Sequence, residues 1–352
     1  MITATKPTSP LFTSSLDTFT FKISGDTATT INCNGMELLS ETYYPVSGSI
    51  TIYDLGTLIA DAVRPTVTAS FTIDITEHQG ESDIATWSSG AITAYYATVD
   101  IDMSCPSFID RYFLTLLDGT KLTRLGHREY LHAAGINSST PTVVAQFFKD
   151  NQVTTVQVPS SATPTHTANG ITSFDVSPDR YCDASEGDLF AYTVTVGDRT
   201  QQYQIDHTGS IADPVLLFTN SFGCQEIFYC LGKKKIAPIF ERKSAVIGGK
   251  KINYQVKETR TFEGDTGIIP PSMAHFAEDL LRSDEVYLFR DYAQDKQITL
   301  TDSKSERTNE ADDLAEFTFS YQYSQRIQNV VFKNIDTSSG KIFDRSFDDT
   351  FN

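Results

Sequence analysis

The chain of 352 residues has no apolar run of about 18 residues, and its first residues lack the apolar segment of a signal peptide. We therefore expect no membrane insertion and no signal-directed export. Basic residues are also scarce, since 28 Lys and Arg stand against 45 Asp and Glu, which gives a formal net charge of −17. Binding of nucleic acid requires clustered Lys and Arg, so we expect no nucleic-acid partner.

Cysteine pairs are missing as well. The five cysteines are widely spaced, and no two of them form a CxxC motif. This spacing excludes a zinc ribbon and a thioredoxin-like redox motif. We expect free, buried thiols in a reducing compartment.

Motifs of catalysis and of cofactor binding are absent from the chain. It contains no GxSxG, GxGxxG, GxxxxGK[ST] or HExxH sequence and no EF-hand loop. His127 and His132 are five residues apart, which would place them on different sides of a helix. We therefore expect no catalytic residue, cofactor or metal, and a protein that is not an enzyme. One enzymatic alternative stays open, because two distant carboxylates of a β-rich glycosidase leave no motif.

The residues that are abundant favour strands. Phe (23) and Tyr (16) are frequent, as are Thr and Ser. Apolar residues alternate with polar ones from Glu316 to Tyr323, which is typical of a strand with one face on a core. Three hairpins are predicted, as strand pairs at 143–148 and 153–158, 192–196 and 200–205, and 245–247 and 251–256. Gly248-Gly249 suits the two-residue turn of the third.

Two segments have helical periodicity instead. Apolar residues fall on one helical face in a helix near 54–64, capped by Asp54, and in another near 271–282, which begins at Pro270-Pro271-Ser272. A pentapeptide echo, LFTSS at residue 11 and LFTNS at residue 217, suggests an internal duplication. The expected fold is mostly β, with two tandem antiparallel β-sandwich or barrel domains, each with one short amphipathic helix.

Domain boundaries follow from composition. The stretch 160–170 is rich in Ser, Thr, Pro and Gly, so we place a β-rich domain at 1–160, a second at 161–332, and a C-terminal arm at 333–352. We expect a short helix or a loop from Arg124 to Gly135 and a long exposed loop from Ser303 to Asp313.

Two smaller features concern the surface. The basic run Lys233-Lys234-Lys235 is predicted to be an exposed turn or a strand edge protected from pairing. In the polar tail, Phe343, Phe347 and Phe351 recur every four residues. They suit a short docked helix or an arm that contacts a neighbour, and we take them as candidate assembly contacts.

Two stretches, YYPVSGSITIYDLGTLIADAV from Tyr43 and LLFTNSFGCQEIFYC from Leu216, give the chain a resemblance to tail and baseplate structural proteins of phages and prophages in Bacteroides-type bacteria. The resemblance extends over 42–75 and 214–323. It implies a non-enzymatic structural subunit of the virion, in a ring or tail-tip assembly. Its partners would be further copies of itself and other tail or baseplate proteins. No catalytic residue is carried over.

The alternative is a carbohydrate-binding or adhesin-like β-sandwich module. Trp87 is the one tryptophan of the chain, and Tyr95 and Tyr96 are close to it in sequence. If these three side chains were exposed together, they could stack on the sugar rings of a glycan. If they were buried, they would anchor the core of the first domain instead.

Overall fold

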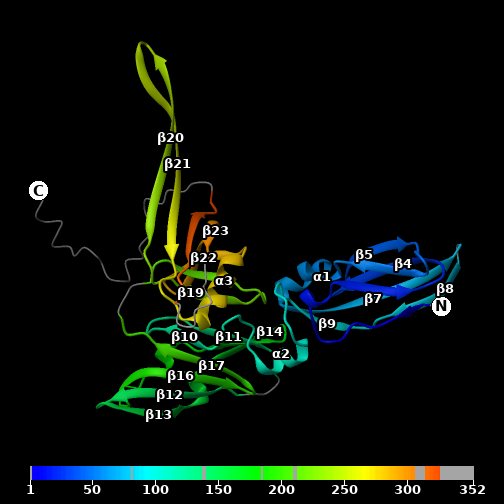
Figure 1. The fold of residues 1–352 in the computed structure, drawn as a ribbon, viewed down its shortest axis with the longest axis horizontal. Helices are drawn as coiled ribbons and strands as arrows, with labels where there is room; N and C mark the ends of the chain where they lie inside the picture. The colour runs from blue at the N-terminus through cyan, green and yellow to red at the C-terminus, as the bar shows by residue number, and fades with distance from the viewer. Residues whose placement is uncertain are drawn as a thin grey trace, which may run out of the picture.

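The computed structural model describes residues 2–80, 82–136, 140–183, 185–208, 212–305 and 314–325. The prediction of a mostly β chain with few helices and β-sandwich-like domains is confirmed. The strands form three groups (Figure 1), which we call the N-terminal unit (2–100), the central unit (113–208) and the C-terminal unit (212–325). No helix of the described residues is long and apolar enough to cross a membrane.

The N-terminal unit is a sandwich of two sheets. One sheet has the order β1 (Thr3–Ala4), β3 (Thr18–Lys22) and β6 (Ser49–Tyr53). The other has the order β2 (Leu11–Phe12), β9 (Ile92–Tyr95), β7 (Thr68–Gln79), β4 (Asp26–Cys33) and β5 (Met36–Tyr43), and β8 (Ser82–Ser88) also pairs with β7. Alternate residues of both sheets point inward, among them Phe21 and Ile73, and make one apolar core.

Helix α1 (Leu55–Val63) forms where the 3.6-residue period predicts it and packs on this core. Its predicted cap is wrong, because the Asp54 side chain makes no capping hydrogen bond. The backbone amide of Gly56 instead donates to the Leu16 carbonyl at 2.6 Å. A Cβ at Gly56 would lie 2.2 Å from the Thr13 carbonyl oxygen, so this close approach requires glycine.

The central unit contains two further sheets with a shared core of large side chains, including Phe147, Phe174 and Tyr203. The first sheet has the order β10 (Thr120–Thr123), β17 (Arg199–Ile205), β16 (Asp188–Val196), β12 (Thr142–Lys149) and β13 (Gln152–Val158). The second has the order β11 (Tyr130–Ala134), β15 (Ile171–Asp175) and β14 (Thr165–Ala168). The predicted hairpins β12–β13 and β16–β17 are both present.

The predicted boundary at 160–170 lies inside this unit. Strand β12 pairs with β16, so residues before and after the boundary share one sheet. The stretch itself contains a 3-10 turn (Ser160–Ala162) and strand β14, which pairs with β15. A division into 1–160 and 161–332 would therefore cut two sheets. The loop-like composition of 160–170 belongs to a connection within one unit and does not mark a boundary between domains.

The C-terminal unit is one seven-stranded sheet with a helix on it. Its order is β19 (Gln225–Tyr229), β18 (Val215–Thr219), β22 (Val286–Arg290), β23 (Ala293–Lys304), β24 (Thr318–Tyr323), β21 (Lys250–Asp265) and β20 (Lys235–Ile247). A 3-10 turn (Pro271–Met273) leads into α3 (Ala274–Arg282), as the proline signal predicts. Phe276 and Leu280 of α3 are buried against the sheet. This strand order differs from that of the N-terminal unit, so the two helix-bearing units are not copies in topology.

The three units meet at one apolar cluster around α2 (Cys105–Arg111), a helix that the sequence did not predict. Phe12 of the N-terminal unit, Phe108 of α2 and Phe222 of the C-terminal unit lie with their ring centroids 5.3 to 6.1 Å apart. Arg64 also forms an ion pair with Asp284 across the N-terminal and C-terminal units, at 2.6 Å. The three units are therefore packed against one another through these contacts.

Two segment predictions need correction. The segment 124–135 contains strand β11, whose Leu131 and Ala133 lie in the central core, whereas Tyr130 is exposed. His132 accordingly lies on a strand and not on a helix. Ser303 and Lys304 belong to strand β23, so the expected loop begins later; residues 306–313 lie outside the described residues.

Candidate functional site

The hairpin of β20 and β21 extends far beyond the rest of the sheet (Figure 1). We call residues 233–260 the arm. Strand β24 pairs with β21 only from Phe262 to Asp265, so the arm has no neighbouring strand among the described residues. A strand rises by about 3.3 Å per residue, so the 13 residues of β20 span roughly 43 Å.

The arm exposes many large apolar side chains. Eight of them have exposed fractions between 43% and 72%. They are Ile236, Ile239, Phe240, Val246, Ile247, Ile252, Tyr254 and Val256. Contiguous exposed apolar surface of this kind marks interaction sites in soluble proteins.

The apolar residues occupy both faces of the arm. Cross-strand partners share a face, so Val246 and Lys251 lie on one face while Ala245 and Ile252 lie on the other. An antiparallel ribbon with one wet face would place polar residues on one side. In the arm, polar and apolar residues are mixed on both faces, so neither face is purely polar.

Local sequence explains why the hairpin forms. Gly248 and Gly249 have φ of 61° and 78°, which is the pair of positive angles that a two-residue hairpin turn requires. The ladder shifts register after Lys243, and Pro238 lies on the outer strand. Bulges, lysines and prolines on an edge strand discourage indiscriminate pairing with other chains. Lys233–Lys235 were predicted to be an exposed turn or a protected strand edge; Lys235 begins the outer strand, and protection from pairing stays a prediction.

The arm is basic in an acidic protein. It holds nine of the 28 basic residues and two acidic ones, a formal charge of +7, which leaves −24 for the remainder of the chain. Between Arg242 and Lys257 there are five basic residues and no acidic one. Two basic residues at the root are paired within the chain, Lys234 with Asp213 and Lys235 with Glu263.

The root of the arm is firmly held. Phe262 is buried and its ring stacks on Tyr321 of the neighbouring strand, with centroids 5.0 Å apart. A two-stranded ribbon alone in water is marginally stable, whereas three or more strands with an apolar face fold independently. The root of the arm is therefore part of the folded sheet, whereas the apolar side chains of its distal part stay exposed to solvent.

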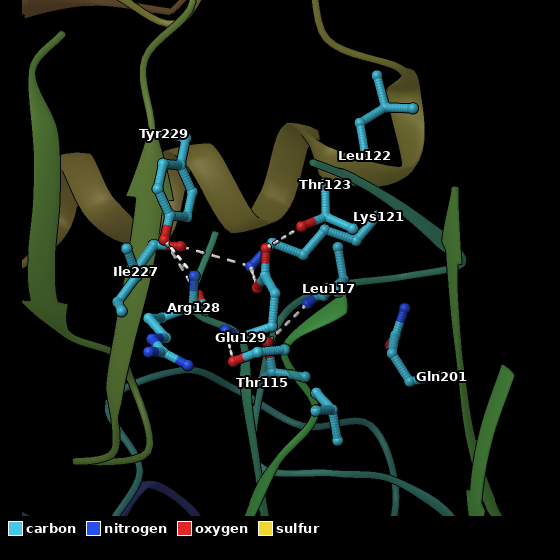
Figure 2. Close-up of polar contacts among 12 residues, drawn as sticks. Thr115, Leu117, Lys121, Leu122, Thr123, Arg128, Glu129, Gln201, Ile227 and Tyr229 are labelled. Carbon is cyan, nitrogen blue, oxygen red and sulfur yellow. Dashed lines mark hydrogen bonds and ion pairs between the residues drawn. The ribbon is translucent and has the colours of Figure 1, made fainter. Parts of the chain in front are cut away.

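A buried ion pair of the central unit lies where that unit meets the C-terminal unit. Lys121 donates to Glu129 at 2.6 Å, and Thr123 donates to the other carboxylate oxygen of Glu129 at 2.8 Å (Figure 2). The Lys121 ammonium also reaches the Ile227 carbonyl of β19 and lies 4.4 Å from the centre of the Phe276 ring of α3. One cation thus contacts both units, in a place with little water.

Neighbouring contacts continue this junction. The Arg128 amide donates to the Tyr229 hydroxyl at 2.6 Å, as Figure 2 shows. The imidazole of His127 stacks on the ring of Tyr229 with centroids 3.5 Å apart. Burial, together with the charges of Arg124 and Lys121, lowers the pKa of His127 to about 3. The junction therefore keeps this histidine neutral over the physiological range.

Two more buried acids lie in the C-terminal unit. The Ser221 amide and hydroxyl both donate to the carboxylate of Asp279. Burial raises the pKa of Glu226 to about 8, although the charge of Lys121 opposes that rise. Burial likewise raises the pKa of Glu129 and of Asp279. The hydrogen bonds of Lys121 and Arg128 to β19 are the polar contacts here that join the central unit to the C-terminal unit.

The residues singled out from sequence have different outcomes. Phe343, Phe347 and Phe351 lie outside the described residues. Tyr95 and Tyr96 are buried, and Trp87 packs partly buried beside Phe19 with ring centroids 5.8 Å apart. The three aromatic residues therefore do not form the exposed platform that glycan stacking requires.

The sequence predicted the turn of the arm but did not indicate that the arm is a candidate functional site. The available signal was the stretch 242–257, where basic residues alternate with large apolar ones and no acid occurs. The cysteines agree better with expectation, since all five are free and four are buried, with Cys182 exposed. Within the described part of the chain, no group of three or more His, Cys, Asp and Glu is placed to hold a metal ion.

Comparison with known proteins adds little. No protein-family model matches the chain, and no curated protein matches it. A similar solved structure is the "Crystal structure of Dscam1 isoform 6.9, N-terminal four Ig domains", at 9% sequence identity. The match covers 75% of this chain and 69% of that one, with a TM-score of 0.14. At that score the likeness carries no argument about this protein.

Proposed function

We propose that the protein is a non-enzymatic structural subunit of a phage or prophage tail or baseplate assembly, and that the arm makes its principal contacts. The observation that carries the proposal is the arm itself, with eight exposed large apolar residues on a ribbon of charge +7. Its partners are further copies of the chain and other tail or baseplate proteins, and its location is the virion.

Two properties of the chain support an assembly role. A partner that covers both faces of the arm would remove its apolar side chains from water, which is the main driving force of protein association. The pairing of β21 with β24 and the stacking of Phe262 on Tyr321 anchor the root of the arm, so that contacts at its tip would set the position of the whole subunit. Assemblies commonly use an extended β-segment of one subunit against another in this way.

A shortened arm tests the proposal. Removing residues 242–247 and 250–256 keeps Gly248-Gly249 as the turn and leaves the pair Glu241–Lys257 beside it. The altered gene replaces the natural one in the phage or prophage, and particles are purified on a density gradient. We expect the natural chain in tail-bearing particles and the shortened chain outside them.

The matched control reverses the charge of two exposed basic residues outside the arm, in the double variant R111E/K149E. This variant should enter particles normally. The proposal fails if purified particles contain no copy of the natural chain. It fails equally if the shortened chain enters particles as well as the natural one does.

A further inference from the structure

The N-terminal unit has a surface complementary to the arm. Residues 23–63 contain five acidic residues and no basic one. The arm has the reverse composition, with five basic residues and no acidic one between Arg242 and Lys257. The basic stretch is the longest of its sign in the C-terminal unit, and opposite potentials of this kind orient two partners.

The acidic stretch includes a strand edge. Strand β5 pairs with β4 on one side, and no described strand pairs with its other side. Glu37 and Glu41 are exposed on β5. Met36, Tyr44 and Val46, on the strand and the turn after it, are exposed by 56%, 69% and 79%. The edge therefore offers backbone hydrogen-bonding groups, apolar side chains and negative charge together.

The arm and β5 lie at different ends of the molecule (Figure 1). The β5 of the same copy is thus out of reach of the arm. We propose that the arm of one copy docks along the β5 edge of a second copy, with Glu37 and Glu41 facing the basic residues of the arm. This inference rests on the proposed assembly function and names its partner.

Several features favour a second copy over a polyanion. DNA or an acidic polymer would satisfy the positive charge but offers no apolar side chains, whereas Met36, Tyr44 and Val46 beside the β5 edge can pack against apolar residues of the neighbouring arm. An edge strand can add its hydrogen bonds to β20, whose outer side pairs with no described strand. Since the two surfaces differ, the contact is head-to-tail, and repetition gives a closed ring or an open filament.

Charge exchange between two full-length variants tests the docking. The first carries R242E, K243E, K250E and K251E in the arm, and the second carries E37K and E41K in β5. Their association is measured by sedimentation velocity at low ionic strength, beside the natural chain and the R111E/K149E control. We expect each variant alone to associate at least about tenfold more weakly than the natural chain, since close charge pairs at interfaces contribute to binding.

Mixing the two variants provides the decisive step. In the mixture, each acidic arm meets a basic β5 and each basic arm meets an acidic β5, so association should return. Because folding of each variant is checked by circular dichroism, loss alone would not be mistaken for unfolding. Recovery on mixing supports the specific pairing of these two surfaces.

Three outcomes would overturn the inference. The natural chain could remain a monomer at about 100 μM, where even weak contacts are visible. The β5 variant could associate as the natural chain does, or the mixture could fail to recover. If the natural chain bound a short DNA duplex and did not self-associate, the occupant would be nucleic acid. Each of these results is compatible with loss of the shortened chain from particles, so the proposed function would stand with another partner.

Discussion

Apolar and basic side chains are buried and paired at the junction of the three units, whereas the same kinds of side chain are exposed in the arm. At the junction, Phe12, Phe108 and Phe222 are enclosed by one another, and the charge of Lys121 is matched by Glu129. In the distal arm, residues such as Val246 and Tyr254 are exposed. The side chains of the junction find their partners within the chain. The exposed side chains of the arm are available for contacts with another molecule.

This difference separates stability from function. A residue at the junction contributes to the free energy of unfolding, because its removal leaves a cavity or an unpaired charge. A residue in the distal arm has few partners to lose in the free chain. Substitutions in the two regions should therefore affect different measurements.

The largest effect is expected at the aromatic cluster. Phe222→Ala removes a fully buried ring that contacts Phe12 and Phe108. Substitutions of this type cost about 3 to 5 kcal/mol. Urea unfolding followed by tryptophan fluorescence measures the loss, and a change below about 1 kcal/mol would show that the cluster does not hold the units together.

The buried ion pair comes next. Lys121→Met leaves the Glu129 carboxylate buried without its cation, and breaking such a pair costs about 3 to 5 kcal/mol. The double variant K121M/E129L removes both charges and should recover much of that loss. Equal destabilisation of the single and double variants would show that the pair itself is not the source of the effect.

An intermediate effect is expected from pH. Burial raises the pKa of Glu226 to about 8, from an ordinary value of 4.5, so the folded chain keeps a proton that the unfolded chain has released. Stability should then fall as pH rises from 6.5 to 8, by up to ~1.4 kcal/mol per pH unit. The lowered pKa of His127 gives a slope of the opposite sign, because the unfolded chain binds this proton as pH falls through 6.5, and that contribution fades above pH 7.

Glu226→Gln is the control for the pH effect, because the amide cannot ionise. Thermal unfolding at several pH values compares the two chains. The slope between pH 6.5 and 8 should flatten in the variant. An unchanged slope would assign the titration to another group.

The smallest effect on stability is expected in the arm. Tyr254→Ala, at a residue 62% exposed, should change the free energy of unfolding by less than about 0.5 kcal/mol. The same substitution should weaken assembly, as measured by sedimentation. A loss of stability comparable to that of Phe222→Ala would mean that the arm belongs to the fold of the free chain.

Local signals in the sequence predicted the elements well but not their grouping. The alternation around Phe319 and the helical period of α3 are local patterns, and both elements formed where expected. The pairing of β10 with β17, in which Thr120 lies beside Gln202, joins residues far apart in sequence, and no local pattern encodes it. The boundary at 160–170 failed for this reason.

The site was harder to predict than the fold. The turn at Gly248-Gly249 was evident, but the ladder extends back to Lys235, beyond the short strands expected. Exposure of its apolar residues depends on which strands lie beside it, and this is a property of the whole sheet. The buried pair of Lys121 and Glu129 was likewise invisible, since charged residues in a sequence are normally expected on the surface.

The molar mass of the full-length and shortened-arm chains in solution tests the central claim most directly. Light scattering at matched concentrations and low salt would follow both chains, after circular dichroism shows that both are folded. If the arm is a contact surface, the natural chain should form species that are multiples of 39.0 kDa and grow with concentration, while the shortened chain stays monomeric. Multimers of the same mass for both chains would contradict the account, because the contact would then lie outside the arm, and two monomers would exclude a second copy as the partner of the arm.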